Sequence, residues 1–179
     1  MIVCLGWGSL VWEPGELKVV GKWKRDGPDL PVEYLRHSRD GRLTLVIDSA
    51  VPCSQVLWAQ MDYVNAIDAK ENLRIREGKI KDEHVGVWKT GQNNPRYLPD
   101  LHTWAERVGA ETVIWTALPP KFENIDYKKP NIEDAIAHIE NLSAQSKRLA
   151  EEYVRKTPAQ IRTPFRIKFE EYFNWSLLS

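Results

Sequence analysis

The chain has 179 residues, which is enough for one well-packed domain and short for two. Its 25 basic and 25 acidic residues balance, so no strong basic field favours a nucleic acid or a membrane surface as partner. No apolar run approaches the roughly 20 residues that span a bilayer, and the first residues lack the pattern of a signal peptide. We therefore expect a cytoplasmic protein that binds neither nucleic acid nor a membrane.

The first sixty residues have the pattern of short strands separated by turns. Apolar runs of strand type occupy residues 2–5, 17–21, 32–38, 43–47 and 55–61. An Asp-Gly pair, a good hairpin signal, stands between the third run and the fourth, and a proline separates the fourth from the fifth. Short antiparallel strands in succession predict a curled sheet or a small barrel.

The rest of the chain alternates between helical and strand periods. Helices are predicted over residues 64–74, 98–108, 132–139 and 144–155, and further strands over 84–88 and 112–118. Asn131 is a good cap for the third of these helices, which has acids in its first turn. Residues 157–179 are too apolar to form a free tail. The prediction is one α+β domain over residues 1–179, with a small curled or barrel-like mixed β-sheet, flanking helices and a helical part from about residue 131.

The cysteines and histidines do not indicate a metal site. Cys4 and Cys53 are single cysteines in apolar stretches, so buried, reduced thiols are expected. No metal-ligand spacing occurs among the four histidines, which are residues 37, 84, 102 and 138. A nucleophilic pair of cysteine and histidine stays open, although no local pattern favours it. We therefore expect no metal site.

The first strand runs into a loop of small residues, Gly6-Trp7-Gly8-Ser9-Leu10, which allows several interpretations. A dinucleotide fingerprint and a nucleophile elbow each need a glycine where Val11 stands, so neither fits. A nest of backbone amides that binds a small anion needs only small residues and a concave backbone. A plain turn at the end of a strand fits the local sequence equally well.

A second unusual segment lies at the end of the predicted helix 64–74 and contains Glu77 directly before Gly78. The C-terminal end of a helix disfavours a negative charge, so a carboxylate at this point is poorly placed for capping. Glu77 is therefore either an acid with a function or a solvated acid paired with Arg74 or Arg76.

Taken in order, these segments resemble the γ-glutamylcyclotransferase-like superfamily, which includes the ChaC-type glutathione-degrading enzymes. That family has a Tyr-Gly-Ser-Leu loop, often followed by an apolar residue, Trp and a Pro-Gly turn, and residues 7–15 read Trp-Gly-Ser-Leu-Val-Trp-Glu-Pro-Gly. An Arg- and Ser-containing strand and an apolar strand come next, compared here with residues 34–38 and 42–46. A Val-x-Gly-x-x-Tyr strand and a helix ending in an acid follow, compared with residues 56–61 and 73–78.

The resemblance covers roughly residues 1–88 and implies an activity. Backbone amides of Trp7, Gly8, Ser9 and Leu10 would hold the α-amino-acid end of a γ-glutamyl amide or peptide. Glu77 would act as the general base for attack of the substrate α-amine on the γ-carbonyl, a lyase or acyl-transfer reaction that releases 5-oxoproline without a cofactor. The partner implied is a small γ-glutamyl substrate.

Two departures from the family pattern leave the substrate and the leaving amine open. Trp7 stands in place of the motif tyrosine, and residues 79–81 read Lys-Ile-Lys where a Gly-Tyr pair is usual. Glu71 also fits the family's pattern around the acid. A protein that binds an amino-acid-like anion without turnover, and a structural or interaction module, are the alternatives to an enzyme.

Overall fold

The computed structural model describes residues 1–176, which divide into two compact units. Unit 1 contains residues 1–30 and 55–118, and unit 2 contains residues 31–54 and those from 119 onward. The chain therefore leaves unit 1, returns to it, and ends in unit 2. Whether the two units together form one domain stays a prediction.

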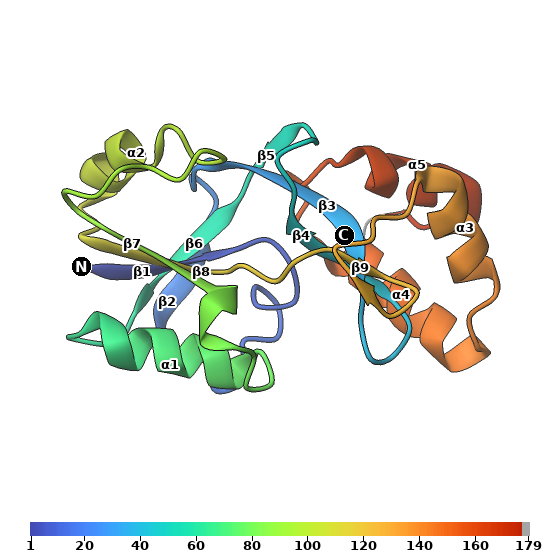
Figure 1. The fold of residues 1–179 in the computed structure, drawn as a ribbon, viewed down its shortest axis with the longest axis horizontal. Helices are drawn as coiled ribbons and strands as arrows, with labels where there is room; N and C mark the ends of the chain where they lie inside the picture. The colour runs from blue at the N-terminus through green and yellow to red at the C-terminus, as the bar shows by residue number, and fades with distance from the viewer. Residues whose placement is uncertain (177–179) are drawn as a thin grey trace. The chain divides into compact units, whose positions relative to one another are not determined.

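A five-stranded mixed sheet is the centre of unit 1, with the strand order β2-β6-β1-β8-β7 (Figure 1). β1 pairs with β8 in parallel and with β6 antiparallel, and the remaining neighbours are antiparallel. The strands are β1 Ile2–Gly6, β2 Val19–Lys24, β6 Leu57–Met61, β7 Val85–Lys89 and β8 Thr112–Thr116. The parallel pair joins residues that are far apart in the sequence, since Ile2 lies opposite Thr112.

The helices of unit 1 cover both faces of this sheet. They are α1 Ala66–Arg76, α2 Leu101–Val108 and the short 3-10 helix η1 Asp82–His84. Figure 1 shows α1 on one face and α2 on the other. Ile2 and Cys4 of β1 pack with Ala69 and Leu73 of α1 in one buried cluster. Side chains alternate between the two faces along each strand, so the intervening side chains point to the opposite face of the sheet. On that face the ring of Trp58 in β6 packs edge-on against the ring of Trp104 in α2.

Unit 2 combines a second sheet with three helices. Its strand order is β10-β9-β3-β4, and β5 also pairs with β3. The strands are β3 Asp29–His37, β4 Leu43–Ile47, β5 Cys53–Gln55, β9 Lys121–Phe122 and β10 Ile125–Asp126. β3 and β5 span points where the chain passes from one unit to the other. The helices are α3 Ile132–Glu140, α4 Ala144–Lys156 and α5 Pro164–Phe173.

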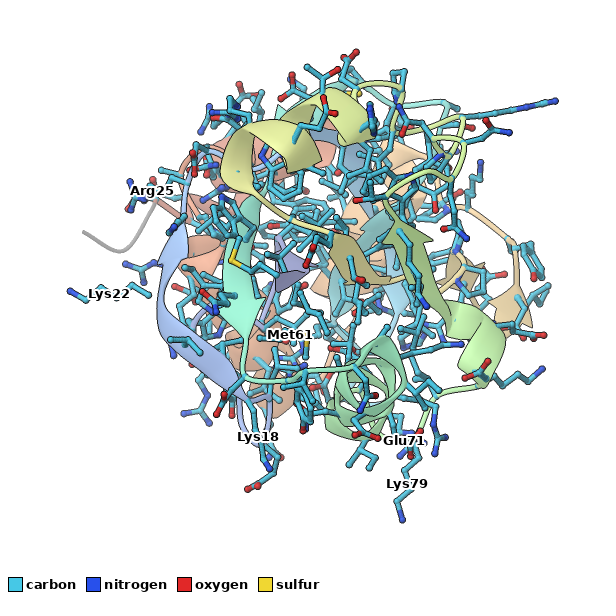
Figure 2. The ribbon with its side chains drawn as sticks, turned by 90° about the vertical axis from the view of Figure 1, so that its left-hand side faces the viewer. Lys18, Lys22, Arg25, Met61, Glu71 and Lys79 are labelled. Atoms are coloured by element: carbon cyan, nitrogen blue, oxygen red, sulfur yellow. The ribbon has the colours of Figure 1, made fainter. Side chains whose placement is uncertain are left out.

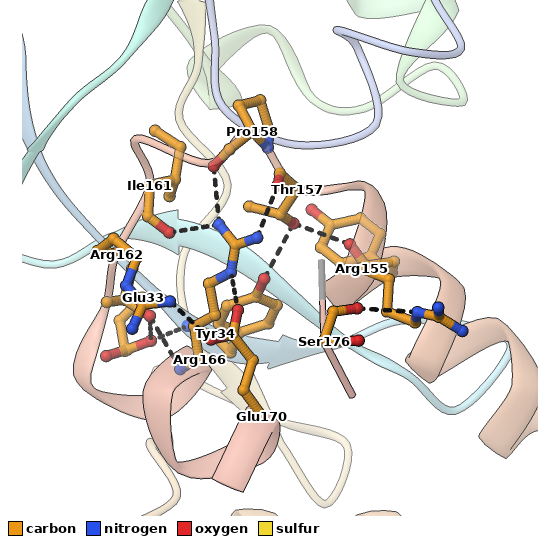
Figure 3. A network of polar contacts seen from close by, with 12 residues as sticks. Glu33, Tyr34, Arg155, Thr157, Pro158, Ile161, Arg162, Arg166, Glu170 and Ser176 are labelled. Carbon is orange, nitrogen blue, oxygen red and sulfur yellow. Dashed lines mark hydrogen bonds and ion pairs between the residues drawn. The ribbon is translucent and has the colours of Figure 1, made fainter. Parts of the chain in front are cut away.

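A buried polar network ties α5 to the rest of unit 2 (Figure 3). Arg166 is fully buried, and its guanidinium donates to the carbonyl oxygens of Thr157, Pro158 and Ile161 and pairs with Glu170. Each of the three guanidinium nitrogens therefore has a hydrogen-bond acceptor and the charge has a partner inside the protein, which is the condition for burying an arginine.

The mixed α+β architecture predicted from the sequence is confirmed, and so are most of its elements. The side chain of Asn131 caps α3 as expected and forms a capping box with Asp134. The expected strand 55–61 is interrupted at Val56, which separates β5 from β6. The apolar tail forms α5 and its flanks, and its last residues, 177–179, lie outside the described part of the chain.

Two expectations about the first sixty residues were wrong. The early strands do not form one sheet, because β1, β2 and β6 belong to unit 1 whereas β3 and β4 pair in unit 2. Cys53 is exposed rather than buried, while Cys4 is completely buried. An apolar neighbourhood in the sequence does not decide burial in a short strand such as β5, in which only the central residue, Ser54, is buried.

Among the described residues, no helix combines the length and the apolar character needed to cross a bilayer.

Candidate functional site

The loop after β1, which in the structure continues through the turn to Glu13, is held in place by two buried side chains. Trp7 and Leu10 are buried, and Leu10 belongs to the core cluster that packs against α1. Gly6 lies under the ring of Trp23, and a β-carbon at Gly6 would come within 2.5 Å of that ring. Glycine is therefore required at position 6 for close packing. The two anchoring side chains are part of the core, so the backbone and Ser9 are the parts of this loop left for chemistry.

The backbone of the loop forms a tight turn with open donors at its start. The N–H of Val11 donates to the carbonyl oxygen of Gly8 over 3.0 Å, and that of Glu13 donates to Ser9 over 2.8 Å. Within residues 1–176, the N–H groups of Gly8, Ser9 and Leu10 have no hydrogen-bond acceptor. Consecutive open N–H groups at the start of a turn are the donors that a backbone anion site uses.

Helix α1 ends beside this loop, and the sequence explains where it stops. Glu77 is the C-cap, with its N–H bonded to the carbonyl oxygen of Leu73. Gly78 follows with φ +84°, in the left-handed region that glycine adopts at no steric cost. The chain turns away after Glu77, and the side chain of this residue stays at the end of the helix.

Arg76 joins the end of α1 to the loop. Its Nη1 lies 2.8 Å from Oε1 of Glu77, and its Nη2 donates to the carbonyl oxygen of Glu13 over 2.6 Å and to Oγ of Ser9 over 3.3 Å. The structure therefore brings together two of the predicted site segments, the loop and Glu77. Sequence reasoning named Arg76 only as a possible partner of Glu77 and missed its contacts with the loop, because these come from residues more than sixty positions away.

The surroundings of Glu77 shift the pKa of its carboxyl group upward. Its side chain is 16% exposed. Burial raises the pKa of Glu77 above its ordinary value, and the charge and the hydrogen bond of Arg76 oppose this rise without cancelling it. The charges of Glu77 and Arg76 also act on the buried thiol of Cys4. Burial and, to a lesser extent, the charge of Glu77 raise the pKa of this thiol, while the charge of Arg76 opposes the rise. One interpretation of the sequence was a solvated acid paired with Arg74 or Arg76. Glu77 is indeed paired with Arg76, but it is largely shielded from solvent.

Glu71, the other acid considered from the sequence, has a different environment. It projects from the outer side of α1 (Figure 2) and forms a bidentate pair with Arg74 at 2.6 and 2.7 Å. The hydrogen bond from Arg74 lowers the pKa of Glu71. Its described contacts do not include the loop, so Glu77 and not Glu71 is linked to Ser9, through Arg76.

The described residues contain no group of three or more histidine, cysteine, aspartate or glutamate side chains arranged to hold a metal ion. The groups at this site, which are a carboxyl whose pKa is raised and a set of open backbone donors, suit acid–base chemistry. Comparison of the chain with protein-family models, with curated proteins and with solved structures gave no match.

Proposed function

We propose that this protein is an enzyme of the γ-glutamylcyclotransferase type. The observation that carries the proposal is the chain of contacts from Glu77 through Arg76 to Ser9 and Glu13, which joins a partly buried carboxyl to the loop with open amides. The resemblance of residues 7–15 and 73–78 to the family's loop and acid supports the same assignment.

In the proposed reaction the substrate supplies both reacting groups. Glu77 takes a proton from the α-amine, whose nitrogen forms a bond to the γ-carbonyl carbon. The bond from that carbon to the leaving amine breaks, and the proton passes to the leaving amine. The products are 5-oxoproline and a free amine or peptide. Ring closure is intramolecular, so correct positioning provides a large part of the rate enhancement.

The side chains around the loop favour a base mechanism over a nucleophilic one. A serine nucleophile needs a neighbouring base, but the described partner of Ser9 Oγ is Arg76, which has no acceptor. A cysteine nucleophile reacts as its thiolate, and the pKa of Cys4 is raised by burial. Glu77 is the acid that combines a raised pKa with contact to the loop residues through Arg76.

The test is to incubate the protein with glutathione, γ-glutamyl dipeptides and γ-glutamyl amines, and to measure 5-oxoproline by mass spectrometry. Glu77→Gln retains the size of the side chain and removes the base, so turnover should fall about 100-fold or more. Binding of 5-oxoproline, measured by calorimetry, should be retained. Glu71→Gln is the matched control on the same helix and should retain the parent rate, since Glu71 does not contact the loop.

Each negative outcome has a separate meaning. Equal rates for the parent and Glu77→Gln would show that Glu77 is not the base. A parent protein that binds 5-oxoproline but releases none from any substrate would be a binding protein. Ser9→Ala should weaken turnover without abolishing it, and complete loss in a folded variant would favour a serine nucleophile instead.

A further inference from the structure

We propose that Arg76 is a positioning residue that holds the Glu77 carboxylate and the loop of residues 8–13 in one arrangement. The inference deepens the proposed function and rests on it, because it assigns how the proposed base is aimed at the loop. One guanidinium makes all the contacts: Nη1 to Glu77, and Nη2 to Ser9 Oγ and to the Glu13 carbonyl oxygen.

The geometry of these contacts requires an arginine. The acceptors of Arg76 come from two separate segments, the helix end and the loop, and they occupy two different nitrogens of a planar group. A lysine has one nitrogen and no fixed fork, so it can retain the charge but cannot hold the two segments at the same time. The side chain of Arg76 is only 13% exposed, and a partly buried guanidinium loses little of this interaction to solvent.

The contacts of Arg76 also leave part of Glu77 available. Arg76 donates to Oε1, while Oε2 of Glu77 receives no hydrogen bond from the residues that the structure describes. One oxygen is therefore fixed, and the other can accept a proton. Arg76 of α1 is the charged group that acts on Glu77, and it favours the carboxylate, while the neighbouring thiol of Cys4 in β1 is itself affected by the charge of Glu77.

The experiment compares the parent chain with Arg76→Lys, Arg76→Met and the control Arg74→Met. Arg74 is on the same helix two positions earlier, but it pairs with Glu71 and the carbonyl oxygen of Ile80. Three quantities are measured: the titration of the Glu77 carboxyl by NMR, the exchange rates of the loop amides Val11 and Glu13, and kcat/KM for 5-oxoproline release as a function of pH. Thermal unfolding checks that each variant is folded.

In Arg76→Met, loss of the positive charge should move the Glu77 titration and the acid limb of kcat/KM to higher pH. The loop amides should exchange faster, and kcat/KM should fall about 100-fold because the base and the loop are no longer aligned. Arg76→Lys should retain the titration midpoint better than Arg76→Met, but it should show the same fast exchange. Arg74→Met should resemble the parent in all three measurements.

An unchanged titration and unchanged loop exchange in folded Arg76→Met would overturn the role of Arg76. A shift of equal size in the Glu77 titration of Arg74→Met would also overturn this role, because any positive charge on the helix would then have the same effect. The titration and the exchange rates do not depend on turnover. A parent that releases no 5-oxoproline would therefore refute the proposed function, while the other two measurements would still decide whether Arg76 links Glu77 to the loop.

Discussion

Cys4 and Cys53 differ in their access to solvent, although both are in strands. Cys4 is fully buried beneath α1, and burial raises the pKa of its thiol. Cys53 is exposed at the start of β5. Only a thiolate reacts with a disulfide reagent, and the reagent must also reach it.

We predict that the folded protein has one reactive thiol. Titration with an aromatic disulfide reagent should modify Cys53 within minutes and should modify Cys4 only after denaturation. Cys53→Ser should leave a folded protein that does not react. Rapid modification of two thiols in the native state would show that Cys4 is accessible, in contradiction to the packing of β1 against α1.

Glu71 within α1 and Glu77 at its C-cap also show that position, and not residue type, decides chemical behaviour. Glu71 and Glu77 are six residues apart on one segment, yet the pKa of Glu71 is lowered by its hydrogen bond from Arg74, whereas that of Glu77 is raised by burial. A rotation of about 600° separates the two along an ideal helix, which puts them on different faces. Of the two, Glu77 is the one that Arg76 links to the loop.

At the scale of elements, α5 is fastened to β3 by a buried acid. Glu33 is almost completely buried and accepts hydrogen bonds from the Thr163 hydroxyl at 2.5 Å and from the Phe165 N–H at 3.1 Å, both at the first turn of α5 (Figure 3). A carboxyl group at the start of a helix satisfies donors that have no partner within the helix. Burial raises the pKa of Glu33, and these hydrogen bonds oppose the rise.

Glu33→Ala should lower the free energy of unfolding by about 2–3 kcal/mol, because it leaves the Thr163 hydroxyl and the Phe165 N–H without their acceptor inside the protein. Urea unfolding followed by circular dichroism measures this change. Glu171→Ala, which removes an exposed partner of Lys168 on the same helix, is the control and should change stability little. Equal stabilities of the two variants would contradict a fastening role for Glu33.

At the scale of the whole molecule, the formal net charge is zero, so general charge repulsion contributes little near neutral pH. Individual groups should therefore dominate the pH dependence of stability. His37 of β3 has a buried Nδ1 without a partner among the described residues, and its ring lies 4.6 Å from that of His138. Burial first, and then the positive fields of His138 and Lys121, lower the pKa of His37, while Asp40 opposes them.

A lowered pKa in the folded state means that the unfolded chain binds the His37 proton at a higher pH than the folded chain does. Below about pH 6.5 the unfolded state therefore gains protons first, and His37 reduces stability as the pH falls further. The raised pKa values of Glu33 and Glu77 act in the opposite direction, so the informative quantity is the difference between the parent and His37→Gln.

The parent should lose more stability than His37→Gln when the pH is lowered from about 7.5 to about 5.5, as measured by urea unfolding. His102→Gln, at a half-exposed histidine of α2, is the control and should follow the parent. Parallel pH profiles for the parent and His37→Gln would show that His37 does not contribute.

Local sequence was sufficient to predict most of the individual elements. The capped start of α3 at Asn131, the strand over residues 43–47 and the end of α1 near Gly78 each depend on residues within a few positions of one another. Periodicity, capping side chains and glycine conformations act over that range, so a single sequence contains the information needed.

Which strands share a sheet was not predictable in the same way. The early strands are divided between the two units, because β1, β2 and β6 lie in unit 1 whereas β3 and β4 pair in unit 2. The central strand of unit 1 also pairs with residues more than a hundred positions later, as in the pair of Ile2 and Thr112. Such pairing depends on which apolar faces meet in space, and the strand pattern itself is the same for several arrangements.

For the candidate site, the sequence by itself determined the loop after the first strand, the acid at the end of the helix and the family that these residues resemble. Only the tertiary structure decided that Glu77 lies beside the loop, that Glu71 does not, and that Arg76 joins the two segments. The physical reason is that burial, ion pairing and the resulting pKa values depend on the groups that surround a side chain in space. In this protein those groups come from segments that are far apart in the chain.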